Sequence, residues 1–219
     1  MREHYREELE DINNCLVEMA NSVGSAMSKA TTALLDADVA LADLVIAGDE
    51  HIDAVRENIE ERCFTLLARQ QPVATDLRTV TTAMRIVSDL ERMGDLAVHV
   101  AKLARMRFPE PAVPAEVRPI FVEAGHVAQS LVAQVGAVIA KLDVQGAAQL
   151  ERDDDLMDQL HRQLFTELLS PGWPHGMESA IDITLLGRYY ERYADHAVSV
   201  ARRVVFLVTG EREMTALPI

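Results

Sequence analysis

Residues 89–102 of this chain read DLERMGDLAVHVAK, and residues 189–202 read YYERYADHAVSVAR. The two stretches share the pattern Glu-Arg-x-x-Asp-x-Ala-Val-x-Val-Ala followed by a basic residue, a match too long to expect by chance. The pattern predicts an internal duplication, which decides the fold before any other signal. Both copies keep a Glu and an Asp four residues apart, so on a helix the two acids lie on one side, one turn apart.

The duplication extends toward the N-terminus of each half with a different offset. Four positions recur 105 residues later: Asp38 as Asp143, Asp49 as Asp154, Asp53 as Asp158 and Ile59 as Leu164. The first half therefore carries about five extra residues before its last element. We expect them in the segment 70–74, which reads QQPVA, because Pro and polar residues interrupt helices.

Composition and proline placement predict an all-α chain of two tandem homologous three-helix bundles. The 219 residues are 49% hydrophobic but only 5% aromatic, and Ala, Leu, Val, Met and charged residues favour helices. Four of the eight prolines lie between Pro109 and Pro119, where they prevent a continuous helix. We therefore expect one repeat over 1–107, a Pro-rich linker over 108–111 and the second repeat over 112–219. The helices are expected near 4–35, 38–69, 75–106, 117–142, 144–169 and 176–208.

Polar residues at the predicted helix starts are candidate N-terminal caps. They are Asp36 or Asp38, Thr75, Asp143 and Ser179. Gly210 follows the last periodic residues, as is typical of a helix C-terminus.

The charge and the ends of the chain limit the function classes. A net charge of −14 argues against nucleic-acid binding, which needs a basic face, and suits cations or a basic patch on a partner. The same charge also serves simply to keep a helical protein soluble. Cys15 and Cys63 have no metal-ligand spacing and are expected to be buried thiols. The charged N-terminus is no signal peptide, and the apolar run 204–208 is too short to span a bilayer, so we expect a cytoplasmic protein.

Four acidic pairs at a spacing of four residues recur at equivalent places in both halves. They are Asp49/Asp53, Glu91/Asp95, Asp154/Asp158 and Glu191/Asp195. Like charges one turn apart repel, and the rotation of the helix places Glu91 and Asp95 on its apolar side. Carboxylates there must be ion-paired, protonated or bound to a cation. Arg92 and Arg192 are candidates for ion pairs, while oxygen-only ligands indicate Mg²⁺, Mn²⁺ or iron, with one site in each half.

Histidines offer further ligands and one rival hypothesis. His99, one turn beyond Asp95, and His196, next to Asp195, are candidate extra metal ligands. A ferritin-like di-iron enzyme would need two Glu-x-x-His motifs. Residues 123–126 match this motif, but residues 158–161 have Asp in place of Glu. The phosphate-binding pattern Gly-x-x-x-x-Gly-Lys-Ser/Thr is absent from the sequence, so we expect no nucleotide hydrolysis and no enzyme.

Several segments resemble the PhoU family of accessory proteins of bacterial phosphate-specific transport. They are Gly48-Asp49 with Asp53, residues 67–78 (LARQQPVATDLR), residues 89–97 (DLERMGDLA) and residues 207–211 (LVTGE). The resemblance covers essentially the whole chain. The second copy departs from the family pattern at Tyr193 and Ala194, where the family usually has an aliphatic residue and Gly.

The resemblance implies a fold, a site and a function. Family members are duplicated three-helix bundles with a Glu/Asp-x-x-x-Asp motif in each half that binds iron or other metal ions. It also implies a cytoplasmic negative regulator, often a dimer, that couples the ATPase of a phosphate ABC transporter to a sensor histidine kinase. A metal-free helical scaffold, in which all four acidic pairs are ion-paired, remains the alternative.

Overall fold

A computed structural model of the chain describes residues 2–211, with side chains from Tyr5 onward. All regular structure in this range is helical. The helices are α1 (Arg2–Asp36), α2 (Val39–Gln70), α3 (Ala74–Arg107), α4 (Arg118–Lys141), α5 (Val144–Asp153), α6 (Asp155–Leu168) and α7 (Gly176–Thr209). The predicted all-α class is confirmed. Residues 1 and 212–219 of the predicted repeats lie outside the described residues.

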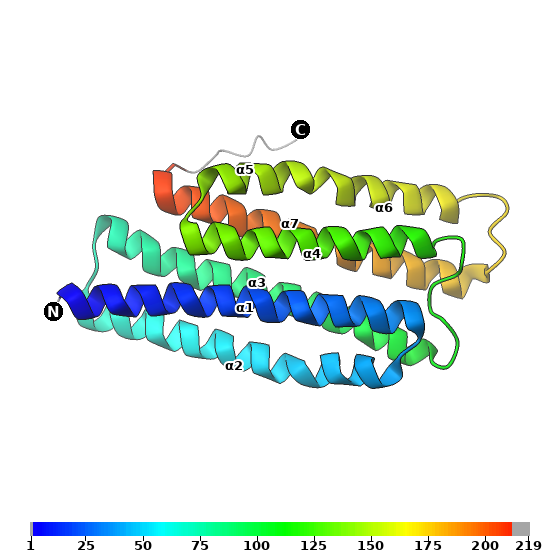
Figure 1. Ribbon diagram of the computed structural model, residues 1–219, viewed down its shortest axis with the longest axis horizontal. Coiled ribbons are helices and arrows are strands. Elements are labelled where there is room, and N and C mark those ends of the chain that lie inside the picture. The colour runs from blue at the N-terminus through cyan, green and yellow to red at the C-terminus, as the bar shows by residue number, and fades with distance from the viewer. Residues whose placement is uncertain (1, 212–219) are drawn as a thin grey trace.

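The helices form two bundles that lie side by side. Helices α1, α2 and α3 pack together in the first half, and α4, α7 and the α5–α6 pair pack together in the second. Figure 1 shows α2 at one edge of the molecule and α5–α6 at the opposite edge, with the other four helices between them. Helix α1 also packs on α4, and α3 packs on α7. The buried side chains of both halves therefore form one continuous hydrophobic core.

Small residues let α1 and α4 approach closely. A Cβ atom added at Gly125 of α4 would lie 2.7 Å from Thr31 Cγ2, and one at Gly24 of α1 would lie 2.8 Å from Val132 Cγ1. Real Cβ contacts are not this short, so larger residues would push the helices apart or strain the core. The Thr31 hydroxyl lies 2.7 Å from the Tyr190 hydroxyl of α7, which extends the contact between the halves to a third helix.

The helix ends confirm some predicted caps and correct others. The Asp38 carboxylate accepts a hydrogen bond from Leu41 N, and the Asp143 carboxylate accepts bonds from Gln145 N and Gly146 N. Gly210 ends α7 with a φ of 78°, a left-handed conformation that glycine adopts without strain. The other proposed caps were wrong, because they lie within helices: Asp36 in α1, Thr75 in α3 and Ser179 in α7.

The single helix predicted over 144–169 is wrong, because the chain breaks into α5 and α6 at Asp154. Met157 N donates to Asp154 O over 2.8 Å, a bond to the third preceding residue that tightens the turn to 3₁₀ geometry. Three adjacent carboxylates, at positions 153–155, meet at this point. Periodicity alone cannot reveal such a break, because the apolar pattern continues on both sides of it.

The Pro-rich segment opens the connection between α3 and α4, which runs over residues 108–117. Ala112, Val113 and Val117 are buried, so this connection packs against the bundles. Arg118, the first residue of α4, pairs with Asp36 at 3.0 Å and donates to the Leu35 carbonyl. These contacts tie the start of the second half to the end of α1.

The structure also tests the expectations about the two cysteines and about membrane-spanning helices. Cys63 is buried, as expected, and its burial raises the pKa of the thiol to about 11, whereas Cys15 is half-buried. Within residues 2–211, we find no helix with the length and apolarity needed to cross a bilayer.

Removing either confirmed cap should destabilise the fold measurably. Asp38→Ala and Asp143→Ala should each lower the free energy of unfolding by about 1 kcal/mol, because a backbone N–H at the helix start loses its acceptor. Urea unfolding followed by circular dichroism measures the change. Ser179→Ala is the matched control, and its effect should stay within a few tenths of a kcal/mol. An equal loss in all three variants would contradict the capping assignment.

Candidate metal centres

In the first half, the acidic pair of α2 faces the acidic pair of α3. Burial raises the pKa of Asp49, and the negative charges of Asp95 and Asp53 raise it further. Burial and the charge of Asp95 likewise raise the pKa of Glu91. A Cβ at Gly94 would lie 3.9 Å from Asp49 Oδ1, so glycine lets α3 approach that carboxylate. The four predicted acids of this half are therefore electrostatic neighbours.

The second half repeats this arrangement with stronger repulsion. Burial raises the pKa of Asp154 to about 6, helped by the charges of Asp158, Asp195, Asp155 and Glu191. Asp154 lies at the break between α5 and α6. Of the four acids that raise its pKa, Asp155 and Asp158 lie on α6, and Asp195 and Glu191 lie on α7. A raised carboxyl pKa means that the ionised form is poorly compensated by its surroundings. The four predicted acids of the second half therefore also lie together.

Arginines hold several of these carboxylates. Arg92 Nη1 lies 2.9 Å from Asp95 Oδ2, and Arg92 Nε lies 3.8 Å from Glu91 Oε2. In the second half, Arg188 pairs with Glu191. The expectation that Arg192 supplies this pair was wrong, because Arg192 is exposed and forms no ion pair with any described residue. Among residues 5–211, no three Asp, Glu, His or Cys side chains converge as they stand to hold a metal.

An orphaned nitrogen lies beside the second set of acids. His161 Nε2 is buried and has no hydrogen-bond partner among the described residues, and His161 Nδ1 lies 4.0 Å from Glu191 Oε1. A buried polar atom without a partner costs about 1–3 kcal/mol. Half-buried carboxylates beside an imidazole whose Nε2 has no partner among the described residues are a donor set that suits a cation. The residues present therefore fit a metal ion, provided that their side chains rotate out of the arginine pairs.

The two histidines considered as extra ligands have other partners. His99 is close enough to Asp49 to influence its pKa, but its ring stacks on Tyr189 with a centroid separation of 5.2 Å. His196 Nδ1 lies 3.1 Å from Asp89 Oδ1, so His196 points into the contact between α3 and α7. His161 lies next to the second acidic cluster instead, although its spacing from Asp158 had suggested only a di-iron site.

Sequence reasoning missed the polar cluster that joins the two halves. Asp89 of α3 is buried, and its carboxylate accepts hydrogen bonds from Ser199 Oγ at 3.1 Å and from Arg203 Nε, in addition to its contact with His196. Burial alone would raise the pKa of Asp89, but these bonds outweigh it and lower the pKa. Tyr189, the counterpart of Asp89 in the second half, stacks on His99 instead. The contact between the halves is thus chemically asymmetric.

Comparisons with known proteins identify the family. The sequence model of the PhoU domain matches this chain twice, over residues 16–104 and 121–204. The chain belongs to the PhoU family. It is 50% identical, over 96% of its length and 99% of the relative, to the phosphate-specific transport system accessory protein PhoU homolog 2 of Mycobacterium tuberculosis. A homolog from Aquifex aeolicus is 36% identical over 93% of this chain and 92% of that protein.

Solved PhoU structures share the fold. The crystal structure of PhoU from Pseudomonas aeruginosa superposes with a TM-score of 0.86 at 32% identity, and the match covers 94% of this chain and 100% of that one. The phosphate transport system regulatory protein PhoU of Streptococcus pneumoniae gives a TM-score of 0.85 at 27% identity, over 95% and 98% of the two chains. The two PhoU domains in one chain confirm the predicted duplication and the tandem bundles.

The departures from the PhoU pattern lie in the core. Tyr193 and Ala194 are fully buried, as is Met93, and Gly94, the counterpart of Ala194, is also buried. Burial raises the pKa of Tyr193, whose hydroxyl has no hydrogen-bond partner within the described part of the chain. Glu191, by contrast, is only partly buried. Tyr193 therefore fills the interior of the second PhoU domain and faces away from the side where the acids lie.

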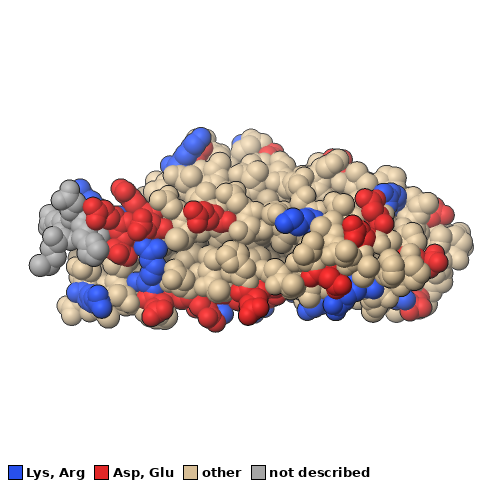
Figure 2. Space-filling view, turned by 60° about the horizontal axis from the view of Figure 1, so that its bottom comes forward, with Lys and Arg blue, Asp and Glu red and all other residues tan. Residues whose placement is uncertain are grey.

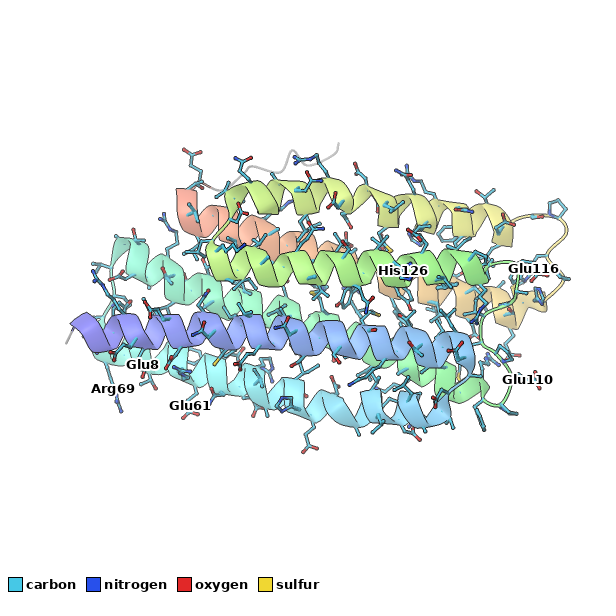
Figure 3. All side chains as sticks on the ribbon, in the orientation of Figure 1. Glu8, Glu61, Arg69, Glu110, Glu116 and His126 are labelled. Atoms are coloured by element: carbon cyan, nitrogen blue, oxygen red, sulfur yellow. The ribbon has the colours of Figure 1, made fainter. Side chains whose placement is uncertain are left out.

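The motif of the rival di-iron hypothesis lies on the surface. The side chains of Glu123 and His126 are 51% and 69% exposed and lie 3.7 Å apart, and Figure 3 shows His126 on α4. A ferritin-like site needs these groups to project into a bundle interior. The Glu-x-x-His interpretation was therefore wrong, and the PhoU family is one of accessory and regulatory proteins by the names of these relatives.

Proposed function

We propose that this protein is a negative regulator of phosphate uptake and of phosphate-starvation signalling. It acts in the cytoplasm as an adaptor between the ATPase subunit of a phosphate ABC transporter and a sensor histidine kinase. The observation that carries this proposal is 50% identity, along nearly the whole of both chains, to an accessory protein of a phosphate-specific transport system. We further propose that it works as a homodimer, reaches the membrane only through its partners, and does not bind nucleic acid.

The carboxylate clusters are proposed to hold Fe, Mn²⁺ or Mg²⁺. Asp49, Asp53, Glu91 and Asp95 would form one site, and Asp154, Asp158, Glu191 and Asp195 the other. A bound cation would neutralise charges that now repel one another across α2–α3 and α6–α7. In its absence, Arg92 and Arg188 supply part of this compensation. Metal loading would therefore change how firmly the outer helices are held on the core.

The acidic surface is the proposed contact face for basic patches on partners. Figure 2 shows Asp and Glu side chains gathered in several groups along the side that carries α2. Exposed members on this helix include Glu50, Glu57 and Glu61, and Figure 3 shows Glu61 pointing outward from α2. Exposed charges are screened within about 8 Å at physiological ionic strength. We therefore expect partner binding to weaken steeply with added salt.

The metal-free scaffold remains the second candidate because the arginine pairs favour it. Arg92 and Arg188 already compensate carboxylates in both halves. Elemental analysis of protein purified without chelator or nickel separates the candidates. A scaffold would contain no stoichiometric Fe, Mn or Mg, and its melting temperature would not rise with metal concentration.

Deleting the gene should switch on phosphate-uptake genes even when phosphate is plentiful, and restoring the wild-type chain should silence them. A reporter for those genes measures the effect. Glu91→Gln with Asp95→Asn should lower bound Mn²⁺ by about one site and weaken silencing. Glu57→Gln with Glu61→Gln, an acidic pair of the same spacing, removes equal charge and should leave bound Mn²⁺ unchanged. Full repression in the deletion strain, with no paralogue present, would contradict the regulator proposal.

A further inference from the structure

The two acidic clusters differ at one position beside the carboxylates. The 105-residue offset that aligns Asp49 with Asp154, and Asp53 with Asp158, also aligns Arg56 with His161. Each of these residues follows the second acid of its pair by three positions, so its side chain lies next to that acid on the helix. A guanidinium thus stands in the first half where an imidazole stands in the second.

Arg56 is surrounded by carboxylates of its own helix. Its Nη1 lies 3.2 Å from Glu60 Oε2, and its Nη2 lies 3.7 Å from Glu57 Oε1. Its Nε lies 4.0 Å from Asp53 Oδ1. Burial raises the pKa of Glu91, and the charge of Arg56 opposes this effect across the α2–α3 contact. A guanidinium stays protonated and cannot ligate a metal, so it reduces the attraction of the first cluster for a cation.

His161 has a different setting. The positions equivalent to Glu57 and Glu60 are Arg162 and Phe165, and the His161 ring packs on Phe165 with centroids 5.0 Å apart. His161 Nε2 is buried without a hydrogen-bond partner in the described range, and Nδ1 lies 4.0 Å from Glu191 Oε1. The imidazole is therefore placed against the acids but is not committed to any of them.

Gly187 makes room for this imidazole. A Cβ added at Gly187 would lie 3.4 Å from His161 Cδ2 and 2.5 Å from Leu164 Cδ2. The equivalent position of the first half, 100 residues earlier, is Val87. In the second half, Gly187 therefore allows α6 to approach α7 closely. This approach brings His161 next to the helical turn of α7 that precedes Glu191.

We propose that His161 is a nitrogen ligand of the second metal site and makes that site selective for transition metals over Mg²⁺. Its companions are the carboxylates of Asp154, Asp158, Glu191 and Asp195. Imidazole favours metals such as Fe, Zn²⁺ and Co²⁺, whereas carboxylates alone suit Mg²⁺ and Mn²⁺. The first site, which has oxygen donors only and Arg56 beside them, binds hard cations and binds them more weakly. This inference rests on the carboxylate sites of the proposed function.

The test uses the full-length chain, freed of metal by a chelator and titrated separately with Co²⁺ and Mg²⁺ by calorimetry. We expect two Co²⁺ sites of unequal affinity. His161→Gln should weaken the tighter site by on the order of 10–100-fold, the range seen when groups that support a metal site are removed, and leave Mg²⁺ binding unchanged. Pulsed EPR of Mn²⁺-loaded protein should show coupling to an imidazole nitrogen that His161→Gln abolishes.

Two matched variants sharpen the result. His126→Gln removes an exposed histidine that is not among the proposed ligands and should change nothing. Arg56→His should give the first site a nitrogen coupling and raise its Co²⁺ affinity, and circular dichroism confirms that each variant folds. Unchanged Co²⁺ affinity and nitrogen coupling in His161→Gln would overturn the inference, while loss of metal in Glu191→Gln with Asp195→Asn would leave the carboxylate sites standing. A wild-type chain that binds neither Co²⁺ nor Mn²⁺ would overturn both.

Discussion

Replacing Asp89 with Ala should lower the free energy of unfolding by about 3 kcal/mol at pH 7, because removing one partner of a buried ion pair leaves the other uncompensated. The Asp89 side chain is 10% exposed and that of Arg203 is 29% exposed. In the variant, Arg203, His196 and Ser199 would lose their carboxylate partner in the contact between α3 and α7. Urea unfolding monitored by circular dichroism measures the loss.

Two comparisons isolate the cause of this loss. Asp89→Asn keeps the shape and an acceptor oxygen, and we expect a clearly smaller penalty. Asp43→Ala breaks an ion pair with Arg105 whose side chains are 58% and 47% exposed, so it should cost less than about 1 kcal/mol. The native pKa of Asp89 is lowered, so its contribution is present above the unfolded value near 3.9 and is lost as the pH falls through the native value. A penalty that does not shrink in acid would contradict this account.

Asp154→Asn should stabilise the metal-free protein by about 1–2 kcal/mol at pH 7.5, a value discounted for the solvent screening of a partly exposed group. The pKa of Asp154 is raised from 3.8 to about 6, so the folded state binds the proton more tightly than the unfolded state. The contribution of Asp154 to wild-type stability therefore rises as the pH falls from about 7 to about 4, whereas the Asn variant lacks this gain. The difference between the two proteins should vanish near pH 4.

Metal should reverse the order of stability. A cation that binds only the folded state stabilises wild type with rising concentration, and Asp154→Asn removes one proposed ligand. Melting temperatures with and without Mn²⁺ should therefore cross between the two proteins. Asp155→Asn, which neutralises the adjacent exposed acid, serves as the control and should keep the wild-type response to Mn²⁺. If Asp154→Asn is no more stable than wild type in chelator, the proposed charge repulsion is wrong.

The repeat made the architecture predictable because one pattern specifies two copies of the same unit. Residues 89–102 and 189–202 imply equivalent helices, and the helices that carry them, α3 and α7, lie against each other at the centre of the molecule. The acidic pairs could be singled out for the same reason, since each pair in the first half recurs at the equivalent place in the second half. The break at Asp154 was not, because it depends on local hydrogen bonds that leave the apolar pattern unchanged.

The contacts between the halves could not be read from the sequence. Asp89 meets residues 107, 110 and 114 positions away, and no short-range spacing links them. The repeat gave no sign of the cluster, because Asp89 and Tyr189 differ and lie outside the shared motif. His161 was hidden in a similar way, since its environment depends on the missing side chain of Gly187 on another helix.

The packing of α1 on α4 and of α3 on α7 gives the single chain the interior of a symmetric dimer. Position 89 contacts position 199, and position 189 contacts position 99, the reciprocal pattern that an isologous interface requires. Covalent linkage makes this association intramolecular, so it holds at any dilution. It also allows the two halves to differ at equivalent positions of their contact. One of these contacts contains a buried charge and the other an aromatic stack, an asymmetry that two identical subunits in a symmetric dimer could not have.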